Sequence, residues 1–117
     1  MTRIFIELPE FKKNWLALGL TDEDLYDLEL FLISNPETGK VISKTGGLRK
    51  IRWSAKGKGK RSGARVLYVD FIMFNKLYLV AAYSKNEKVD ISENEKKRIK
   101  NLIEILKDEN YKNNKER

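Results

Sequence analysis

The side chains that could do chemistry in this 117-residue chain are mostly cationic, and they gather in one segment. Between Glu37 and Asp70 lie ten Lys or Arg residues and no acidic residue. The rest of the chain holds 14 bases against all 17 acids, so this segment creates the net charge of +7. Crowding like charges is costly unless something neutralises them. The asymmetry therefore indicates a polyanionic partner on one face of the protein.

The absence of two residue types narrows the chemistry further. The chain has no cysteine, which excludes disulfides and thiol catalysis, and the additional lack of histidine argues against a zinc site. Lys, Arg, Asp, Glu, Tyr, Ser, Thr and Asn remain as candidate catalytic groups. We expect no bound metal and no small-molecule cofactor.

The glycine-rich sequence KGKGKRSG (56–63) raises the alternative of a phosphate-binding loop. A Walker loop needs Gly-Lys followed by Ser or Thr, whereas Lys60 is followed by Arg61. A dinucleotide-binding fingerprint also fails, because its spacing differs and it opens a helix rather than a strand. A merely solvated loop is the simplest alternative, but the cationic strands on both sides favour a contact with nucleic acid. The residues expected to bind RNA are Arg49, Lys56, Lys60 and Arg61.

The pattern of apolar residues predicts the elements that position these cations. The predicted elements are a strand at 3–8, helices beginning at Pro9 and Thr21, strands at 48–54, 64–74 and 77–84, and a final helix after the capping box Ser92–Glu95. The last three strands should form an antiparallel meander, because their connections are too short for parallel crossovers.

The resulting order β-α-α-β-β-β-α predicts an α+β fold. We expect a small antiparallel sheet with the helices packed on one face and the other face exposed. We also expect a single domain at residues 1–108, followed by a polar, frayed tail at 109–117.

Strand alternation and pairing decide which cations can meet. Lys50 and Arg52 fall on the side of their strand that could line the exposed face, and Arg49 falls on the other. Arg65 begins an otherwise apolar strand, where an unpaired guanidinium is costly, so we expect it at the sheet edge or against a bound phosphate. Antiparallel pairing would bring Lys85, just after the third strand, toward Arg65. Aromatic side chains that could stack on bases, or belong to the core instead, are Trp53, Tyr68, Tyr78 and Tyr83.

Two blocks of the sequence resemble a known family. The blocks TGGLRKIRWSAKGKGKRSGARVLYV (45–69) and LYLVAAYSKNEKVDISENEKKRIKNLIE (77–104), in this order, closely resemble the HigB branch of the RelE/ParE toxin superfamily. The resemblance implies a small antiparallel sheet with helices on one side. It also implies a bacterial toxin, paired with an antitoxin, that enters the ribosomal A site and cleaves the mRNA there.

The resemblance also implies positions for the functional residues. The family's basic strand positions correspond to Lys50, Arg52 and Arg65. A position after the last strand that is often arginine in RelE-type members is Asn86 here, next to Lys85. The tyrosine that RelE-type members use near the final helix corresponds to Ser92, so the KGKGKR loop would have to supply what that tyrosine supplies elsewhere.

The available side chains allow one route to RNA cleavage. RNA can be cut without metal or histidine when its own 2′-OH attacks the adjacent phosphorus, which gives a 2′,3′-cyclic phosphate and a 5′-OH. Arg52 and Arg65 suit the stabilisation of phosphate charge, because a guanidinium is permanently cationic and forked. The sequence does not choose between two lysines as proton carrier, and an amide after the last strand could hold a base or a ribose. The predicted catalytic set is Lys50, Arg52, Lys58, Arg65, Lys85 and Asn86, with Lys58 and Lys85 as the two candidate proton carriers.

Two other function classes stay open at this point, a ParE-like inhibitor of DNA gyrase and an RNA-binding module that does not cut. The convergent basic residues favour RNA cleavage, because a protein inhibitor has no evident need for phosphate ligands. The expected partners are mRNA, the ribosome and a HigA-type helix-turn-helix antitoxin, the last two implied by the resemblance alone. With no apolar run of about 18 residues and no secretory signal, we expect a cytoplasmic protein that does not contact a membrane.

Overall fold

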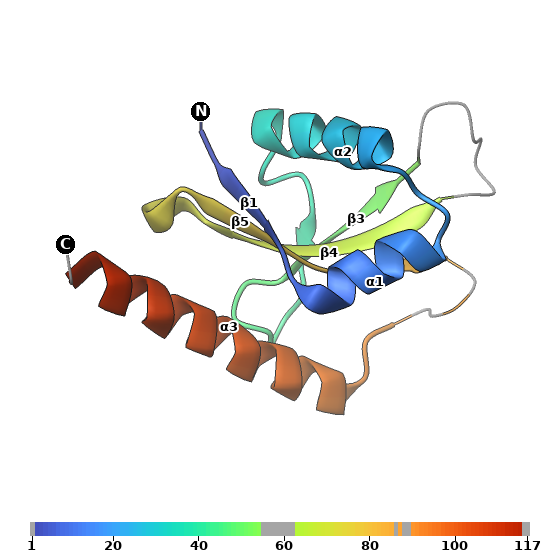
Figure 1. The fold of residues 1–117 in the computed structure, drawn as a ribbon. Coiled ribbons are helices and arrows are strands. Elements are labelled where there is room, and N and C mark those ends of the chain that lie inside the picture. Colours follow the sequence, from blue (N-terminus) through green and yellow to red (C-terminus); the bar gives the residue numbers. More distant parts are fainter. Residues whose placement is uncertain (1, 55–62, 86, 88–89, 116–117) are drawn as a thin grey trace.

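Figure 1 shows the computed structural model of the chain, which describes residues 2–54, 63–85, 87 and 90–115. Its elements, in order, are β1 (Ile4–Glu7), α1 (Pro9–Ala17), α2 (Asp22–Ser34), β2 (Lys40–Val41), β3 (Arg49–Trp53), β4 (Ala64–Phe71), the 3-10 helix η2 (Ile72–Phe74), β5 (Lys76–Ser84) and α3 (Glu93–Lys115). The α+β class and the predicted order of the helices and longer strands are confirmed. The short elements β2 and η2 are additions to the predicted order.

The first two helices begin where the sequence provides caps. Pro9 occupies the first turn of α1, where its fixed backbone angle suits a helix and its missing N–H costs nothing. Thr21 caps α2: its side chain accepts a hydrogen bond from the Asp24 backbone N–H at 3.1 Å, and the Asp24 carboxylate accepts one from the Thr21 N–H at 2.8 Å. Gly19, with φ +74°, makes the turn between the two helices.

The five strands form one mixed sheet in the order β1-β5-β4-β3-β2. The strands β3, β4 and β5 are antiparallel neighbours, so the predicted meander is confirmed. The first strand departs from the expected antiparallel pattern, because β1 pairs with β5 in parallel, with Ile4 opposite Lys76 and Glu7 opposite Leu79. Two helices separate β1 from the meander, and such a long connection permits parallel pairing.

The helices cover both faces of the sheet, which corrects the expectation that they pack on one. Helices α1 and α2 pack on one face, where Phe11 and Leu28 meet sheet residues including Val66. Helix α3 packs on the opposite face, where Ile103 meets Leu67 and its neighbours, and Figure 1 shows α2 and α3 on opposite sides of the strands. The reason lies in β4 and β5, whose side chains are apolar on both faces and need cover on both.

Helix α3 packs against a turn that precedes β3. The Thr45 hydroxyl donates to the Ile42 carbonyl at 2.6 Å and accepts from the Leu48 N–H at 3.1 Å, which fixes the turn. Gly46, with φ +80°, lies so close to the helix that an added Cβ would be 3.6 Å from a methyl of Ile103. Leu48, the residue before β3, is fully buried beneath α3. The exposed basic face is therefore reduced to the end of the sheet that α3 leaves uncovered.

Helix α3 continues through residues 109–115, where we expected a frayed tail. Asn110 is 3% exposed, donates to the Tyr78 hydroxyl at 2.9 Å and accepts from the Lys76 ammonium at 2.6 Å. The packed part of the chain thus extends beyond residue 108, because an amide on α3 satisfies polar groups of β5. Although α3 has 23 residues, neither it nor another helix in the described part of the chain is apolar enough to cross a membrane.

Candidate functional site

The pairing of three strands places two arginines and a tyrosine in one row across the sheet. Arg52 on β3 lies directly opposite Arg65 on β4. On its other side, Arg65 lies directly opposite Tyr83 on β5. Residues that face each other across antiparallel strands point to the same side, and Tyr83 belongs to the core beneath α3. The row therefore lies on the face of the sheet that α3 covers, at the N-terminal end of β4.

The two arginines line a cavity together with a lysine. This cavity has a volume of about 190 Å³ and is lined by Arg52, Trp53, Ser54, Gly63, Arg65 and Lys85. Three of its six lining residues are cationic and none is acidic. Arg52 and Lys85 are exposed, whereas Arg65 is half-buried. The antiparallel strand pairing inferred from the sequence thus brings Lys85 to the cavity that Arg65 lines.

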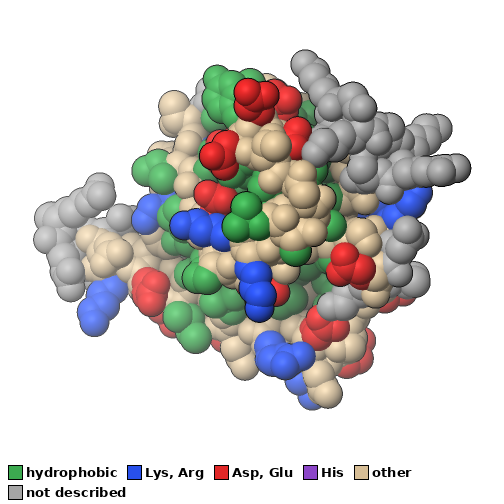
Figure 2. Space-filling view, turned by 45° about the vertical axis from the view of Figure 1, so that its right-hand side comes forward, with side chains coloured by type: hydrophobic (Ala, Val, Ile, Leu, Met, Phe, Trp, Pro, Cys, Tyr) green, Lys and Arg blue, Asp and Glu red, His purple; other side chains and the backbone are tan. Residues whose placement is uncertain are grey.

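The arginines of this row differ from Arg3 in their ion pairing. Within the described residues, neither Arg52 nor Arg65 forms an ion pair, whereas Arg3 pairs with Asp70. Like charges directly opposite each other destabilise a sheet, and a guanidinium without a carboxylate partner retains its capacity to bind an anion bidentately. A group of acidic residues lies in the first turn of α2, and Figure 2 shows acidic and apolar side chains together at the top of the molecule, where α2 lies. The cavity is chemically suited to an anion such as a phosphate.

Lys50 shares the face of this row but lines a different cavity. That cavity has a volume of about 390 Å³ and is lined by Ile42, Lys50, Asp90, Ile91, Glu93 and Lys96. Its two acids and two lysines balance in charge. The cavity lined by Arg52, Arg65 and Lys85, hereafter the cationic cavity, has no such balance among its described residues. Lys50 thus lines a different cavity from Arg52, Arg65 and Lys85, the other described members of the predicted catalytic set.

Arg49 lies on the opposite face of the sheet. Its guanidinium donates to the carbonyl oxygens of Gly39 at 2.7 Å and Glu37 at 3.2 Å. Tyr68, the residue of β4 that lies opposite Arg49, is fully buried beneath α1 and α2. These bonds tie the segment before β2 to the sheet, so Arg49, one of the residues expected to bind RNA, lies on the other face of the sheet from Arg52 and Arg65.

Five predicted site residues lie outside the described residues. They are Lys56, Lys58, Lys60, Arg61 and Asn86. Of the aromatic residues considered for base stacking, Tyr68, Tyr78 and Tyr83 are buried in the core, and Trp53 packs against Trp15 with 5.5 Å between the ring centroids.

From the sequence, Tyr83 was considered only as a base-stacking or core residue, and not as the neighbour of Arg65. Burial raises the pKa of its hydroxyl, Arg65 opposes that shift, and the carboxylates of Asp90 and Glu95 add to it. The phenol is therefore neutral near physiological pH and lies within electrostatic range of both a cation and two acids. Its place opposite Arg65 depends on strand register, which sequence pattern alone does not give.

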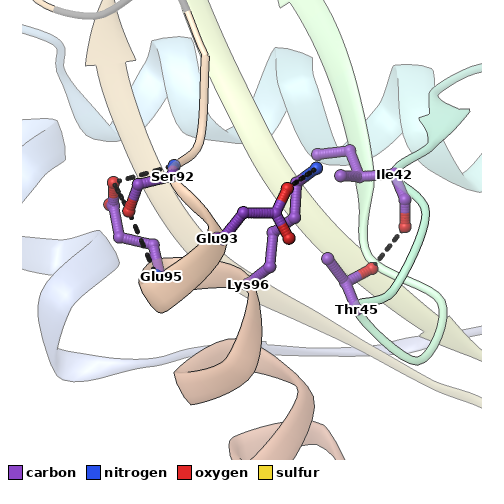
Figure 3. A network of polar contacts seen from close by, with 6 residues as sticks. All are labelled: Ile42, Thr45, Ser92, Glu93, Glu95 and Lys96. Atoms are coloured by element: carbon purple, nitrogen blue, oxygen red, sulfur yellow. Dashed lines mark hydrogen bonds and ion pairs between the residues drawn. The ribbon is translucent and has the colours of Figure 1, made fainter.

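Figure 3 shows the start of α3, with the contacts of Ser92 with Glu95 and of Glu93 with Lys96. The Ser92 hydroxyl accepts from the Glu95 backbone N–H at 3.2 Å, and the Glu95 carboxylate accepts from the Ser92 N–H at 3.3 Å. This confirms the predicted capping box. Ser92, which the resemblance aligns with a tyrosine of RelE-type members, is thus the cap of α3.

Comparisons with known proteins agree with this geometry. The chain matches, over residues 9–115, the family model described as the RelE toxin of the RelE/RelB toxin-antitoxin system. It is also similar to a free-state structure of an E. coli RelE toxin in which two arginines are mutated to alanine, with a TM-score of 0.52 and 14% sequence identity. The match covers 73% of this chain and 85% of the E. coli chain. At this identity the structural likeness shows the fold.

Proposed function

The chain belongs to the RelE toxin family, and from this premise we propose that it is the toxin of a toxin-antitoxin pair and a metal-independent endoribonuclease that cuts mRNA in the ribosomal A site. Arg52 and Arg65, which face each other across two strands in a cavity without a carboxylate, are the observation that carries the proposal. Such a pair costs stability in the unbound protein. A polyanionic substrate offsets that cost when one of its phosphates enters the cavity.

The cavity suits cleavage by the 2′-OH of the message itself. A bond forms between the 2′ oxygen and phosphorus while the bond from phosphorus to the 5′ oxygen breaks, which leaves a 2′,3′-cyclic phosphate and a 5′-OH. Negative charge grows on the non-bridging phosphate oxygens during this exchange. Arg52 and Arg65 would stabilise it, because their guanidinium groups donate in fixed, forked geometry and stay charged throughout.

Lys85 is our candidate for the proton carrier in the described cavity. The reaction removes a proton from the 2′-OH and delivers one to the departing 5′ oxygen. A guanidinium cannot release a proton under these conditions, whereas an amine can both accept and donate one. Among the described residues that line the cavity, Lys85 is the one amine.

The ribosome and an antitoxin complete the proposal. Three cations on a shallow surface do not by themselves fix a flexible RNA in line for attack, so the ribosome would hold the message in place. The resemblance to the HigB branch supports a HigA-type helix-turn-helix antitoxin as the partner that silences the toxin. Both the substrate and the machinery place the protein in the cytoplasm.

Mapping of mRNA 5′ ends in a translating extract tests the proposal. The wild-type protein should produce cuts in phase with codons, and these cuts should vanish when ribosomes are removed. Arg65→Ala should produce none, while Arg98→Ala, which removes the same charge from an exposed position on α3, should cut as the wild type does. Intact mRNA together with inhibited DNA supercoiling would instead favour a gyrase inhibitor.

A further inference from the structure

Two carboxylates lie on the face of the sheet that carries the Arg52–Arg65 pair, yet both line other cavities. Asp90 lines the cavity that contains Lys50. Glu95 lines a cleft of about 540 Å³ between the start of α1, the sheet and α3. Neither carboxylate lines the cationic cavity. A long arginine side chain that can reach a carboxylate normally pairs with it, so a residue that blocks this approach would keep the cavity cationic.

Tyr83 lies where that approach can be blocked. It is the cross-strand neighbour of Arg65, and such neighbours have Cβ atoms about 4.5–5.5 Å apart. Its side chain is 7% exposed, packs in the core that includes Ile91, and lines the cleft that contains Glu95. The pKa of its hydroxyl responds to Arg65 and to both carboxylates, which places the phenol within range of all three groups.

We propose that Tyr83 is a positioning residue that keeps the Arg65 guanidinium available to an RNA phosphate by filling the space through which Arg65 would reach Asp90 and Glu95. The inference rests on the proposed function of the cationic cavity and adds to it a reason why the cavity stays cationic. A buried aromatic ring is rigid and adds no charge, so it excludes the arginine conformations that lead over β5. Arg52 on the other side of Arg65 repels it, and the remaining direction is the cavity.

Binding of a single-stranded RNA pentamer, measured by fluorescence anisotropy at fixed salt without ribosomes, tests this role. Tyr83→Leu should weaken binding about tenfold, the effect of one lost charge-assisted contact, because Arg65 then pairs with a carboxylate. Adding Asp90→Asn and Glu95→Gln to that variant should restore most of the affinity. Glutamine at position 95 also preserves the capping box with Ser92. Cleavage is not needed for this readout, so failure of the nuclease proposal would be seen separately, in intact mRNA.

Two control variants separate positioning from packing. Tyr83→Phe keeps the ring and should bind RNA within about twofold of the wild type, since the ring rather than the hydroxyl blocks Arg65. Tyr78→Leu truncates another buried tyrosine of the same core, one that accepts a hydrogen bond from Asn110. Any loss of affinity in that variant should not respond to Asp90→Asn and Glu95→Gln.

Three outcomes would overturn the proposal. A folded Tyr83→Leu protein with wild-type affinity would show that the ring does not hold Arg65. A loss of affinity that removal of both carboxylates fails to restore would assign Tyr83 to packing alone. If Tyr83→Leu does not fold, the double variant Asp90→Asn with Glu95→Gln in the wild-type chain provides the test. If Tyr83 shields Arg65 from both carboxylates, RNA affinity should change by less than about threefold. A gain in affinity of about tenfold would refute the shielding.

Discussion

Strand β4 has an arginine arrangement near each end, and the two differ in what surrounds the guanidinium. Near the end of the strand, Arg3 donates to both oxygens of Asp70, at 2.7 and 3.2 Å, and the two side chains are 5% and 4% exposed. The hydrogen bond to Asp70 raises the pKa of Arg3 despite burial, which acts in the opposite direction. Near the beginning of the strand, Arg65 faces Arg52 in a cavity without a carboxylate.

The difference shows how one residue type can serve structure or ligand binding on a single strand. At the Arg3 end, the protein supplies the counter-charge, and the buried pair contributes to the fold. At the Arg65 end, the protein supplies a second cation, so the counter-charge has to come from a ligand. Mutation of the Arg3 end should therefore lower stability, whereas mutation of the Arg65 end should lower activity.

The largest effect is expected from Arg3→Met, which leaves the Asp70 carboxylate buried without a partner. The free energy of unfolding should fall by about 3–5 kcal/mol, measured by urea denaturation. Arg3→Met combined with Asp70→Leu should recover most of that loss, because no charge then stays buried. Cleavage per folded molecule should be unchanged in the double variant. Its loss would contradict the division between the two ends.

Arg65→Ala should reverse this pattern. Cleavage of ribosome-bound mRNA should fall about 100-fold or more, because a donor to the developing phosphate charge is lost. The free energy of unfolding should stay within about 0.5 kcal/mol of the wild-type value or increase, since repulsion with Arg52 is relieved. A drop in stability of the size expected for Arg3→Met would make Arg65 a structural residue.

Ser54→Glu should make the Arg65 end resemble the Arg3 end. Ser54 lines the cationic cavity, so a carboxylate there would pair with an arginine and compete with RNA. RNA affinity should fall about tenfold, and stability should rise by at most about 1 kcal/mol, as for an exposed ion pair. Ser54→Gln matches the size of glutamate without its charge. It should change neither the RNA affinity measured by anisotropy nor the stability measured by urea denaturation.

The smallest effect concerns salt. Each phosphate neutralised in a single strand contributes a slope of about −0.7 to the plot of log affinity against log salt concentration. Arg52→Ala should make the measured slope shallower by about that amount, and Arg98→Ala should leave it unchanged. An unaltered slope in Arg52→Ala would mean that this arginine does not contact a phosphate.

Local signals in the sequence predicted much of the fold. The Ser92–Glu95 capping box, the order of the helices and longer strands, and the meander all follow from spacing within short windows, and the structure has each of them. The approach of Lys85 to Arg65 also followed, because hairpin connections determine which ends of antiparallel strands meet.

Long-range packing set the limits of prediction. Helix α3 packs next to Gly46, where an added Cβ would be 3.6 Å from Ile103, and no local pattern reveals this proximity. The parallel pairing of β1 with β5 joins segments far apart in the chain. A register shift between β4 and β5 at Leu67/Tyr68 interrupts strict alternation in β5, where the consecutive residues Val80 and Ala81 both pack in the core beneath α3. Arg49 looked like its neighbours in the basic segment, yet backbone carbonyls of the segment before β2 occupy its guanidinium.

The parallel pairing of β1 with β5 also has a consequence for the order of events during synthesis. The first strand to leave the ribosome finds its sheet neighbour only after residues 76–79 have emerged, and the Arg52–Arg65–Tyr83 row is complete only after residue 83. Pairings so distant in sequence form late, since a long loop has to close before they contribute stability. A nascent chain thus cannot assemble the cationic cavity while most of its own message is still being read.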